Sequence, residues 1–308
     1  VTITDTDSTK IGKLALAVGN YMSGDRIAID GTTIALVNGA TGTTATNSLS
    51  YSVSVSGGTA TLSLTGSKTI AVYDTILQGA KFDSISDNPT SQGTLTTRNI
   101  GITVFDAGYL NPSNTAVSTI TVAPLNDAPT FTATAGGVTY TEGPTPISIW
   151  ATAPSALTDT DAPNFAGGAI AVTLTGYQPG DVLSVNNQGT GSGQISVNGS
   201  AISYNPGTGP VVIASTTGGT TGFLTVNLNA NATPTAVQAL MGQLRYLSTS
   251  DDPTSGGTVT TRTVTVVLND GGNTGSALTA TKSGTITVTA LNDAPTLAAN
   301  SSNPTFTE

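Results

Sequence analysis

The chain has 308 residues, of which 37% are hydrophobic and 9% charged, and 18 Asp and Glu outweigh nine scattered Lys and Arg to give a net charge of −9. Because phosphate binding needs clustered basic residues, this balance argues against a nucleic-acid partner. The sequence contains neither His nor Cys, which excludes a Ser-His-Asp triad, Cys-His catalysis, thiolate chemistry and an ordinary zinc site. Apolar runs are only a few residues long, so no membrane span is predicted.

Strands are predicted wherever aliphatic and polar residues alternate, because successive side chains of a strand point to opposite faces of its sheet. In chain order this pattern covers residues 60–64, 100–104, 120–122, 195–204, 264–268 and 286–288. Within the fourth segment, Asn198-Gly199 has a strong hairpin signature. After Pro234, apolar residues at 237, 240, 241 and 244 have helical spacing, which predicts one short helix. The expected fold class is all-β, with Greek-key β-sandwich domains and at most a short helix in each.

Self-comparison reveals two copies of one unit. The motif LNDAPT occurs at 125–130 and again at 291–296, 166 positions later, and T-(Y/F)-T-E follows each copy. The two glutamates that end these motifs, Glu142 and Glu308, are the only ones in the chain. Further matches are Asp5-Thr6-Asp7 with Asp159-Thr160-Asp161, Ser23-Gly24-Asp25 with Pro179-Gly180-Asp181, Asp87-Asn88-Pro89 with Asp251-Asp252-Pro253, Thr97-Arg98 with Thr261-Arg262, and Asp106 with Asp270.

The order of these motifs predicts the domain organisation. Residues 1–127 form a sandwich that lacks its own first strand, and residues 128–293 form a complete one. Residues 294–308 supply a linker and the first strand of a following domain, or of a neighbouring subunit. Two explanations are open: the chain is a segment of a longer array, which is favoured, or a neighbouring molecule supplies the missing strand.

Carboxylates at the repeat boundaries suggest calcium, which takes six to eight hard oxygen ligands from carboxylates, amides and backbone carbonyls. The expected ligands at the central junction are Asn126, Asp127, Glu142, Asp159 and Asp161. The corresponding residues elsewhere are Asn292, Asp293 and Glu308 at the C-terminal junction, and Asp5 and Asp7 at the N-terminus. Second-rank candidates are Asp106, Asp270, Asp87, Asp251 and Asp252.

The simpler alternative is that these aspartates only cap turns, since Asp and Asn readily bond their own backbone. It explains poorly why the two glutamates occur only at the boundaries. Two carboxylates about 4 Å apart repel by roughly 4 kcal/mol at an effective dielectric constant near 20. One divalent cation between the carboxylates would turn this repulsion into a net attraction and make the linker rigid.

The ordered motifs resemble the cadherin-like repeats of very large bacterial surface adhesins and RTX-type exoproteins. The resemblance spans nearly the whole chain and is carried by both Asn-Asp-Ala-Pro linkers, the Glu of T-(Y/F)-T-E and the Asp-Thr-Asp loops. It implies tandem immunoglobulin-like sandwiches joined by calcium-binding linkers, with the linker, strand and loop residues above as ligands. The chain departs from this pattern in two ways: Phe105 stands where the second copy has Asn269, and the first domain lacks its opening strand, which leaves the Asp5 and Asp7 site incomplete.

The predicted function is a non-enzymatic, calcium-stiffened extracellular repeat of a bacterial surface protein, acting as a spacer, adhesive rod or filament. Its partners would be neighbouring copies of the repeat, with a cell-surface or glycan ligand possible in addition. One alternative is a subunit of a head-to-tail polymer or surface layer, whose C-terminal tail inserts as a strand into the next molecule. Another is a carbohydrate-binding module that uses Trp150 and Tyr177 as a sugar platform.

Overall fold

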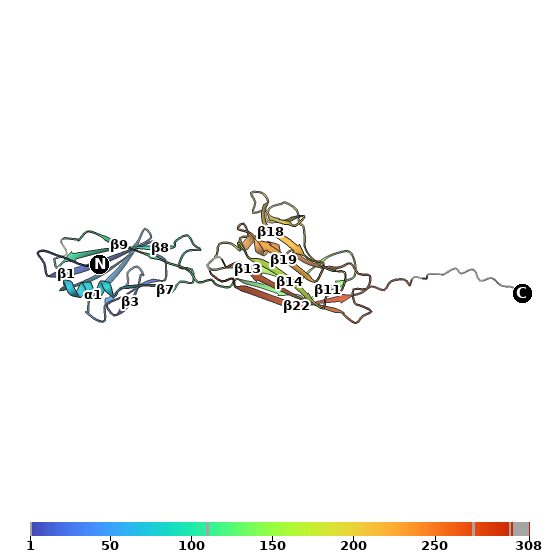
Figure 1. The fold of residues 1–308 in the computed structure, drawn as a ribbon, viewed down its shortest axis with the longest axis horizontal. Coiled ribbons are helices and arrows are strands. Elements are labelled where there is room, and N and C mark those ends of the chain that lie inside the picture. The colour runs from blue at the N-terminus through green and yellow to red at the C-terminus, as the bar shows by residue number, and fades with distance from the viewer. Residues whose placement is uncertain (1, 109–110, 273–274, 296, 298–307) are drawn as a thin grey trace. The chain divides into compact units, whose positions relative to one another are not determined.

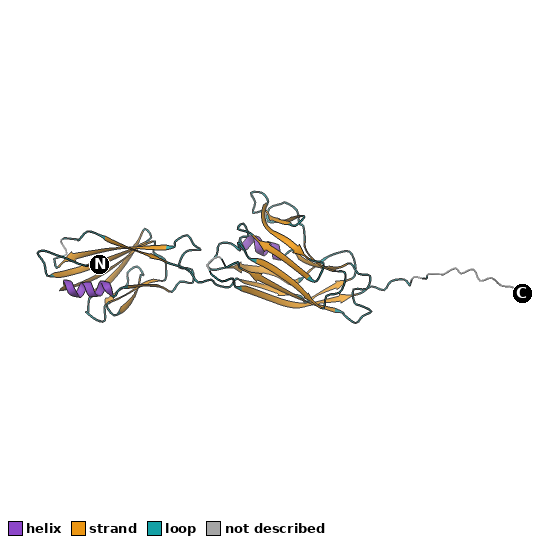
Figure 2. Cartoon of the chain, viewed as in Figure 1, coloured by secondary structure: helices purple, strands orange, loops and turns teal. Residues whose placement is uncertain are grey.

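The computed structural model describes residues 2–108, 111–272, 275–295, 297 and 308 (Figure 1). Within them the chain is built of β-strands and two short helices (Figure 2), which confirms the predicted all-β sandwich fold. It divides into two compact units. The first comprises residues 1–128, 159–163 and 272–278, and the second comprises residues 129–158, 164–271 and 279–308.

The first unit is a sandwich of two sheets with a short helix. Its larger sheet has the order β4 (Thr41–Thr43), β5 (Ser50–Ser56), β6 (Thr59–Thr69), β1 (Lys10–Gly19), β8 (Thr97–Asp106) and β9 (Ala116–Thr121). The smaller sheet has the order β3 (Thr32–Ala35), β2 (Asp25–Ile29) and β7 (Lys81–Ser84), and α1 (Ile70–Gln78) links β6 to β7. Alternate residues Leu14 and Leu16 of β1 and Ile27 and Ile29 of β2 are buried in one core between the sheets.

The second unit repeats this plan and adds strands. Its larger sheet has the order β11 (Val138–Thr141), β22 (Thr279–Thr289), β21 (Thr261–Asn269), β14 (Ala169–Thr175), β19 (Phe223–Leu228), β18 (Val211–Gly218), β17 (Ala201–Tyr204) and β16 (Ile195–Asn198). A second sheet has the order β12 (Ile147–Ser148), β20 (Leu244–Ser248) and β15 (Asp181–Val185). The remaining elements are the pair β10 (Thr130–Ala135) and β13 (Trp150–Thr158), and α2 (Pro234–Met241).

Strand pairing shows the internal repeat directly. Strand β14 pairs antiparallel with β19 and β21, as β1 does with β6 and β8. The last two strands of each unit also pair antiparallel with each other, β21 with β22 and β8 with β9. The second unit has β10, β11, β12 and β13 in addition, and these come from the segment between the first linker motif and the Asp-Thr-Asp loop.

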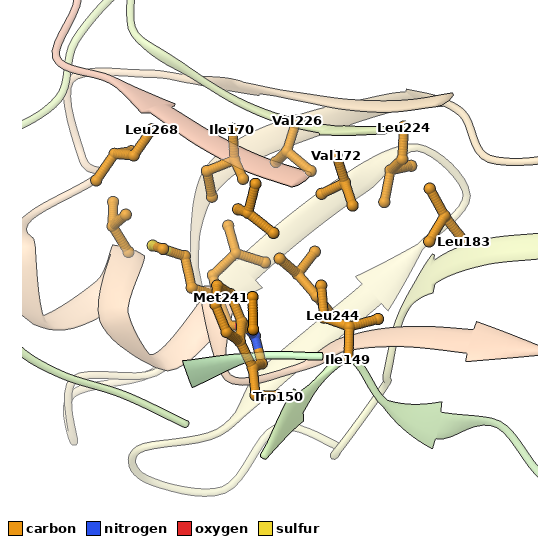
Figure 3. Packing of buried hydrophobic residues seen from close by; sticks show 14 of the residues in the cluster. Ile149, Trp150, Ile170, Val172, Leu183, Leu224, Val226, Met241, Leu244 and Leu268 are labelled. Carbon is orange, nitrogen blue, oxygen red and sulfur yellow. The ribbon is translucent and has the colours of Figure 1, made fainter. Parts of the chain in front are cut away.

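The core of the second unit includes Trp150 (Figure 3). Trp150 is 4% exposed, and its indole Nε1 donates to the carbonyl oxygen of Met241 at 2.6 Å. The ring also makes an edge-on contact with Phe131 of β10. The apolar body of this side chain is therefore buried while its one polar atom is satisfied, as buried indoles require.

The short-range predictions agree with the structure except at element ends. Strands β16 and β17 form the hairpin predicted around Asn198-Gly199. Helix α2 begins at Pro234, but it ends at Met241, whereas Leu244 was expected to be helical and instead opens β20 by pairing with Val185. The described helices are nine and eight residues long, so neither has the length needed to cross a membrane.

Candidate metal sites and a buried arginine pair

A buried Arg–Asp ion pair holds together three of the repeated motifs in each unit. Arg98 Nε donates to Asp25 at 2.6 Å in the first unit, and Arg262 Nε donates to Asp181 at 2.5 Å in the second. All four side chains are fully buried. The guanidinium groups also donate to backbone carbonyl oxygens of the neighbouring loops, those of Pro89 and Leu95 in the first unit and of Pro253 and Val259 in the second.

This network was not predicted from the sequence, in which the acidic residues of the Asp-Asn-Pro and Asp-Asp-Pro loops are second-rank calcium ligands and Asp25 and Asp181 have no assigned role. The signal was present: a chain with only nine basic residues keeps one Arg and one Asp at matching positions of both copies. A buried guanidinium needs a carboxylate and several carbonyl acceptors. The loops supply those acceptors, so their first role is structural.

One aromatic position distinguishes the two networks. Tyr246 donates its hydroxyl to Asp181 Oδ1 at 2.6 Å, and burial together with this hydrogen bond raises the pKa of Tyr246 well above its usual value. Its ring meets Tyr140 edge-on, with the ring centroids 5.3 Å apart. In the first unit the matching residue of β7 is Phe82, which carries no hydroxyl.

At one end of the first unit, Asp5, Asp7 and Asp106 line a common pocket together with Asn111. Asp5 Oδ1 accepts the backbone N–H groups of Asp7 and Ser8 at 3.1 and 3.0 Å. Hydrogen bonds from Asp7 lower the pKa of Asp5. The side-chain hydrogen bond with Asp5, the negative charge of Asp5 and, less strongly, the charge of Asp106 raise the pKa of Asp7. Three of the predicted ligands thus line one pocket, and Asp5 and Asp7 lie in a turn that the Asp5 carboxylate itself caps.

The second Asp-Thr-Asp loop meets the first linker motif within the same unit. Asp159 is buried and Asp161 fully so, and Asp161 Oδ1 accepts the backbone N–H of Asp127 at 3.2 Å. The neighbouring Asn126 donates its side-chain amide to the carbonyl oxygen of Ser276. Two motifs that are 34 residues apart in the sequence therefore come together, as a shared ligand set requires.

Asp87 and Asp251 lie in equivalent loops of the two units. From the sequence, these loops could not be assigned to either end of their domains. Asp87 lines a pocket with Leu125 and Asp127, so it faces the linker that leaves its own unit. Asp251 has the matching place in the second unit, where it lines a pocket with Glu142. Asp252 accepts the backbone N–H groups of Thr254 and Gly256 in the same loop, which is the turn-capping role.

The expected grouping of Glu142 with Asp127 is wrong. Strand β11 runs parallel to β22, and the Glu142 carboxylate accepts the backbone N–H of Leu291 at 2.8 Å, just beyond the end of β22. Asp127 precedes β10 whereas Glu142 follows β11, and each extended residue advances the chain by about 3.3 Å. Glu142 consequently lies beside the second linker motif, in which Leu291 is followed by Asn292 and Asp293.

The remaining predicted residues are placed as follows. Asp270 is buried directly after β21. Asn292 and Asp293 are exposed after β22, where the Asn292 amide donates to the Asp293 carbonyl oxygen. Glu308 is exposed, and the residues immediately before it lie outside the described part of the chain.

The donor chemistry fits calcium better than a transition metal. Among the described residues, no three carboxylates are grouped closely enough to form a metal cluster by themselves. An ion at the linker would therefore need backbone carbonyls and the Asn126 amide oxygen beside Asp127, Asp159 and Asp161. Calcium accepts such mixed oxygen ligands in flexible geometry, whereas zinc prefers the imidazole and thiolate groups that this chain lacks.

A sugar platform on Trp150 is also wrong, because its indole is buried against β10 and α2 rather than presented at the surface. Tyr177 is half-buried, and its hydroxyl donates to the Thr220 carbonyl oxygen. The aromatic pair therefore does not form an exposed face onto which a glycan ring could stack.

No protein-family model matches the chain, and no curated protein matches it. Solved structures that it resembles include cadherin extracellular domains. Protocadherin Gamma B2 domains 3–6 align over 77% of this chain and 38% of that one, with 13% identity and a TM-score of 0.28. Human mucin-like protocadherin EC1–2 aligns over 87% of this chain and 85% of that one, with 12% identity and a TM-score of 0.30.

Proposed function

We propose that this chain is a non-enzymatic extracellular repeat whose linkers are ordered by calcium, so that it serves as a spacer or adhesive rod at a bacterial surface. The observation that carries the proposal is the hydrogen bond from the Asp127 backbone to the Asp161 carboxylate. It brings the linker motif to the Asp-Thr-Asp loop. The matched loop at Asp5 and Asp7 lines one pocket together with Asp106.

The mechanism is mechanical rather than chemical. Calcium would be held by Asp127, Asp159 and Asp161, with Asn126 and Asp87 near enough in the fold to take part. Bound calcium supplies the positive charge that a group of carboxylates needs to stay close together. The protein's own contribution is to hold the two ligand-bearing segments, one after the end of β9 and the other directly after β13. Loss of the ion would free the linker.

Calcium titration by calorimetry tests the binding step. The Asp161→Asn variant should weaken the tightest calcium site at least tenfold, because it removes a buried carboxylate from the ligand set. Asp83→Asn is the matched control, since Asp83 is an exposed acid of the first unit that pairs with Arg26. Equal calcium affinity in the two variants, or no calcium binding by the unaltered chain, would overturn the proposed site.

Small-angle scattering tests the mechanical step separately. The maximum dimension should be larger and better defined in calcium than in EDTA, because an ordered linker holds its neighbours apart. The Asp161→Asn variant should behave in calcium as the unaltered chain does in EDTA. A maximum dimension that does not change on chelation would contradict stiffening even if calcium binds.

A further inference from the structure

One loop of the first unit touches both segments that the proposed calcium site brings together. It connects β7 to β8 and carries the Asp-Asn-Pro motif, so we call it the Asp-Asn-Pro loop. Its Asp87 lines a pocket with Asp127 of the linker. Farther along the loop, the Gln92 side-chain amide donates to the Ala162 carbonyl oxygen at 3.4 Å, 70 positions later in the chain. The residue before Ala162 is Asp161, whose carboxylate accepts the linker N–H.

The Asp-Asn-Pro loop is held in place from the inside of the unit. Arg98 is fully buried and donates to the carbonyl oxygens of Pro89 and Leu95 at 2.5 and 3.0 Å. Within the loop, the Asn88 side chain accepts the backbone N–H of Gln92 at 2.7 Å. The Gln92 side chain therefore extends from a backbone that the buried ion pair and the loop's own hydrogen bonds keep fixed.

The backbone at Gln92 has a conformation that favours glycine. Its φ is +55°, and the matching residue of the second copy is Gly256, with a φ of +65°. The residues before them, Ser91 and Ser255, have φ values of +51° and +50°. The two loops thus share one backbone conformation, and only the first has a side chain at this position. Such a side chain is disfavoured, because its Cβ comes close to the following carbonyl oxygen.

Strain of this kind points to a role, because it persists only where the surrounding structure maintains it and it gathers at functional sites. Burial does not explain the residue, since Gln92 is exposed. What its side chain does is donate to the Ala162 carbonyl oxygen, a bond that Gly256 has no side chain to make in the second copy. The strained position therefore coincides with the contact to the second Asp-Thr-Asp loop.

We propose that Gln92 is a positioning residue that fixes the second Asp-Thr-Asp loop to the Asp-Asn-Pro loop. Asp161 is thereby held where it accepts the Asp127 N–H. Residues 159–163 cluster with the first unit, so this contact lies inside one unit. The effect on calcium rests on the proposed function: ligands that are ordered before the ion arrives bind it more tightly, because less freedom is lost on binding.

A glutamine suits this place better than the other polar side chains. Ala162 follows Asp161 directly, and Asp87 lies in the same loop as Gln92. Lys or Arg could donate to the carbonyl oxygen, but a positive charge here would repel a cation bound by the neighbouring carboxylates. An ionised Asp or Glu only accepts hydrogen bonds. The amide of Gln92 donates without adding charge.

Hydrogen exchange of the Asp127 amide tests the positioning role without any metal, because this N–H is bonded to Asp161. In EDTA, Gln92→Ala should speed this exchange about three- to tenfold, the effect of losing one neutral hydrogen bond. Thr94→Ala is the matched control, since Thr94 Oγ1 donates within its own loop, to the Ser91 carbonyl oxygen. The control should leave the exchange of Asp127 unchanged. Nuclear magnetic resonance measures both rates.

Gln92→Gly separates the side-chain contact from the backbone strain. It should match Gln92→Ala in the exchange of the Asp127 amide, since both variants lack the donor. Its unfolding constant for the first unit should be about threefold smaller than that of Gln92→Ala, because glycine relieves the left-handed conformation. The linker thus loosens while the body of the unit does not weaken, a combination that a merely structural residue would not produce.

Calcium titration by calorimetry completes the test, and each result decides. Gln92→Ala should weaken calcium binding about three- to tenfold, and Thr94→Ala should not. Equal exchange of Asp127 in these two variants would overturn the positioning role, whatever calcium does. Faster exchange with unchanged calcium affinity would overturn the link to the ion. Faster exchange without calcium binding by the unaltered chain would overturn the proposed function and leave the positioning role standing. A glycine variant less stable than the alanine variant would overturn the strain.

Discussion

The two buried arginines are the residues on which the loops of both units depend most. Arg98 and Arg262 each bind a buried aspartate and two loop carbonyl oxygens, with no exposure to solvent. Replacing one partner of such a pair leaves the other charge buried without compensation, which costs far more than losing a surface pair. The repeated Asp-Pro loops and Thr-Arg strands are thereby one structural unit rather than separate motifs.

Arg262→Met should lower the free energy of unfolding of the second unit by about 3–5 kcal/mol, and Arg98→Met should do the same to the first. Urea unfolding followed by circular dichroism measures both. The control is Arg26→Met, since Arg26 and Asp83 form a partly exposed pair that should contribute about 0–1 kcal/mol. Similar losses for Arg26 and Arg262 would show that the buried network does not hold the loops.

Tyr246→Phe should cost the second unit about 1.5–3 kcal/mol, the range for a hydrogen bond to a charged group. The change removes the hydroxyl that donates to Asp181 and leaves the ring in place. The first unit provides the natural comparison, because Phe82 already stands beside the Asp25–Arg98 pair. If denaturant unfolding of Tyr246→Phe matches that of the unaltered chain, the hydroxyl contributes nothing to the network.

Among the elements, the two helices differ in how they begin. Thr233 caps α2 by accepting the N–H of Ala236 through its side chain, and Pro234 follows at the first helical position. Thr69 occupies the matching place before α1 but makes no capping hydrogen bond with its side chain. Capping side chains satisfy helix N–H groups that otherwise lack intrahelical partners.

Thr233→Ala should therefore destabilise the second unit by about 1 kcal/mol. Thr69→Ala should leave the first unit nearly unchanged, so the two substitutions form a matched pair at equivalent positions. Chemical denaturation of both variants measures the difference. A loss of stability at Thr69 as large as that at Thr233 would mean that the cost arises from packing of the methyl group instead of the cap.

Sequence patterns predicted the elements well and their long-range partners poorly. Alternation along β8 and β21 and the turn at Asn198-Gly199 are local signals, and the structure follows them. The error on Glu142 arose because β11 pairs with a strand almost 150 residues later, and nothing local in T-Y-T-E reveals that partner. Arg262 and Asp181 were missed for the same reason, being 81 residues apart.

For the whole molecule, the proposed calcium site links ion binding to stability. A ligand that binds only the folded state at a hundred times its Kd adds about 2.7 kcal/mol to the free energy of unfolding. Saturating calcium should accordingly raise the Tm of the first unit by roughly 5–10 °C. Scanning calorimetry with calcium and with EDTA measures the shift. Asp161→Asn should abolish most of it, and a full shift in that variant would place the ion elsewhere.

Trp150 gives the chain an optical asymmetry. It is the only tryptophan, and it lies in the interior of the second unit alone. Its fluorescence emission should shift to longer wavelength when the second unit unfolds. The emission should not change when the first unit unfolds. A melting curve recorded by indole fluorescence therefore follows the second unit only. Comparing it with a backbone circular dichroism signal, to which both units contribute, separates the two unfolding transitions without a label.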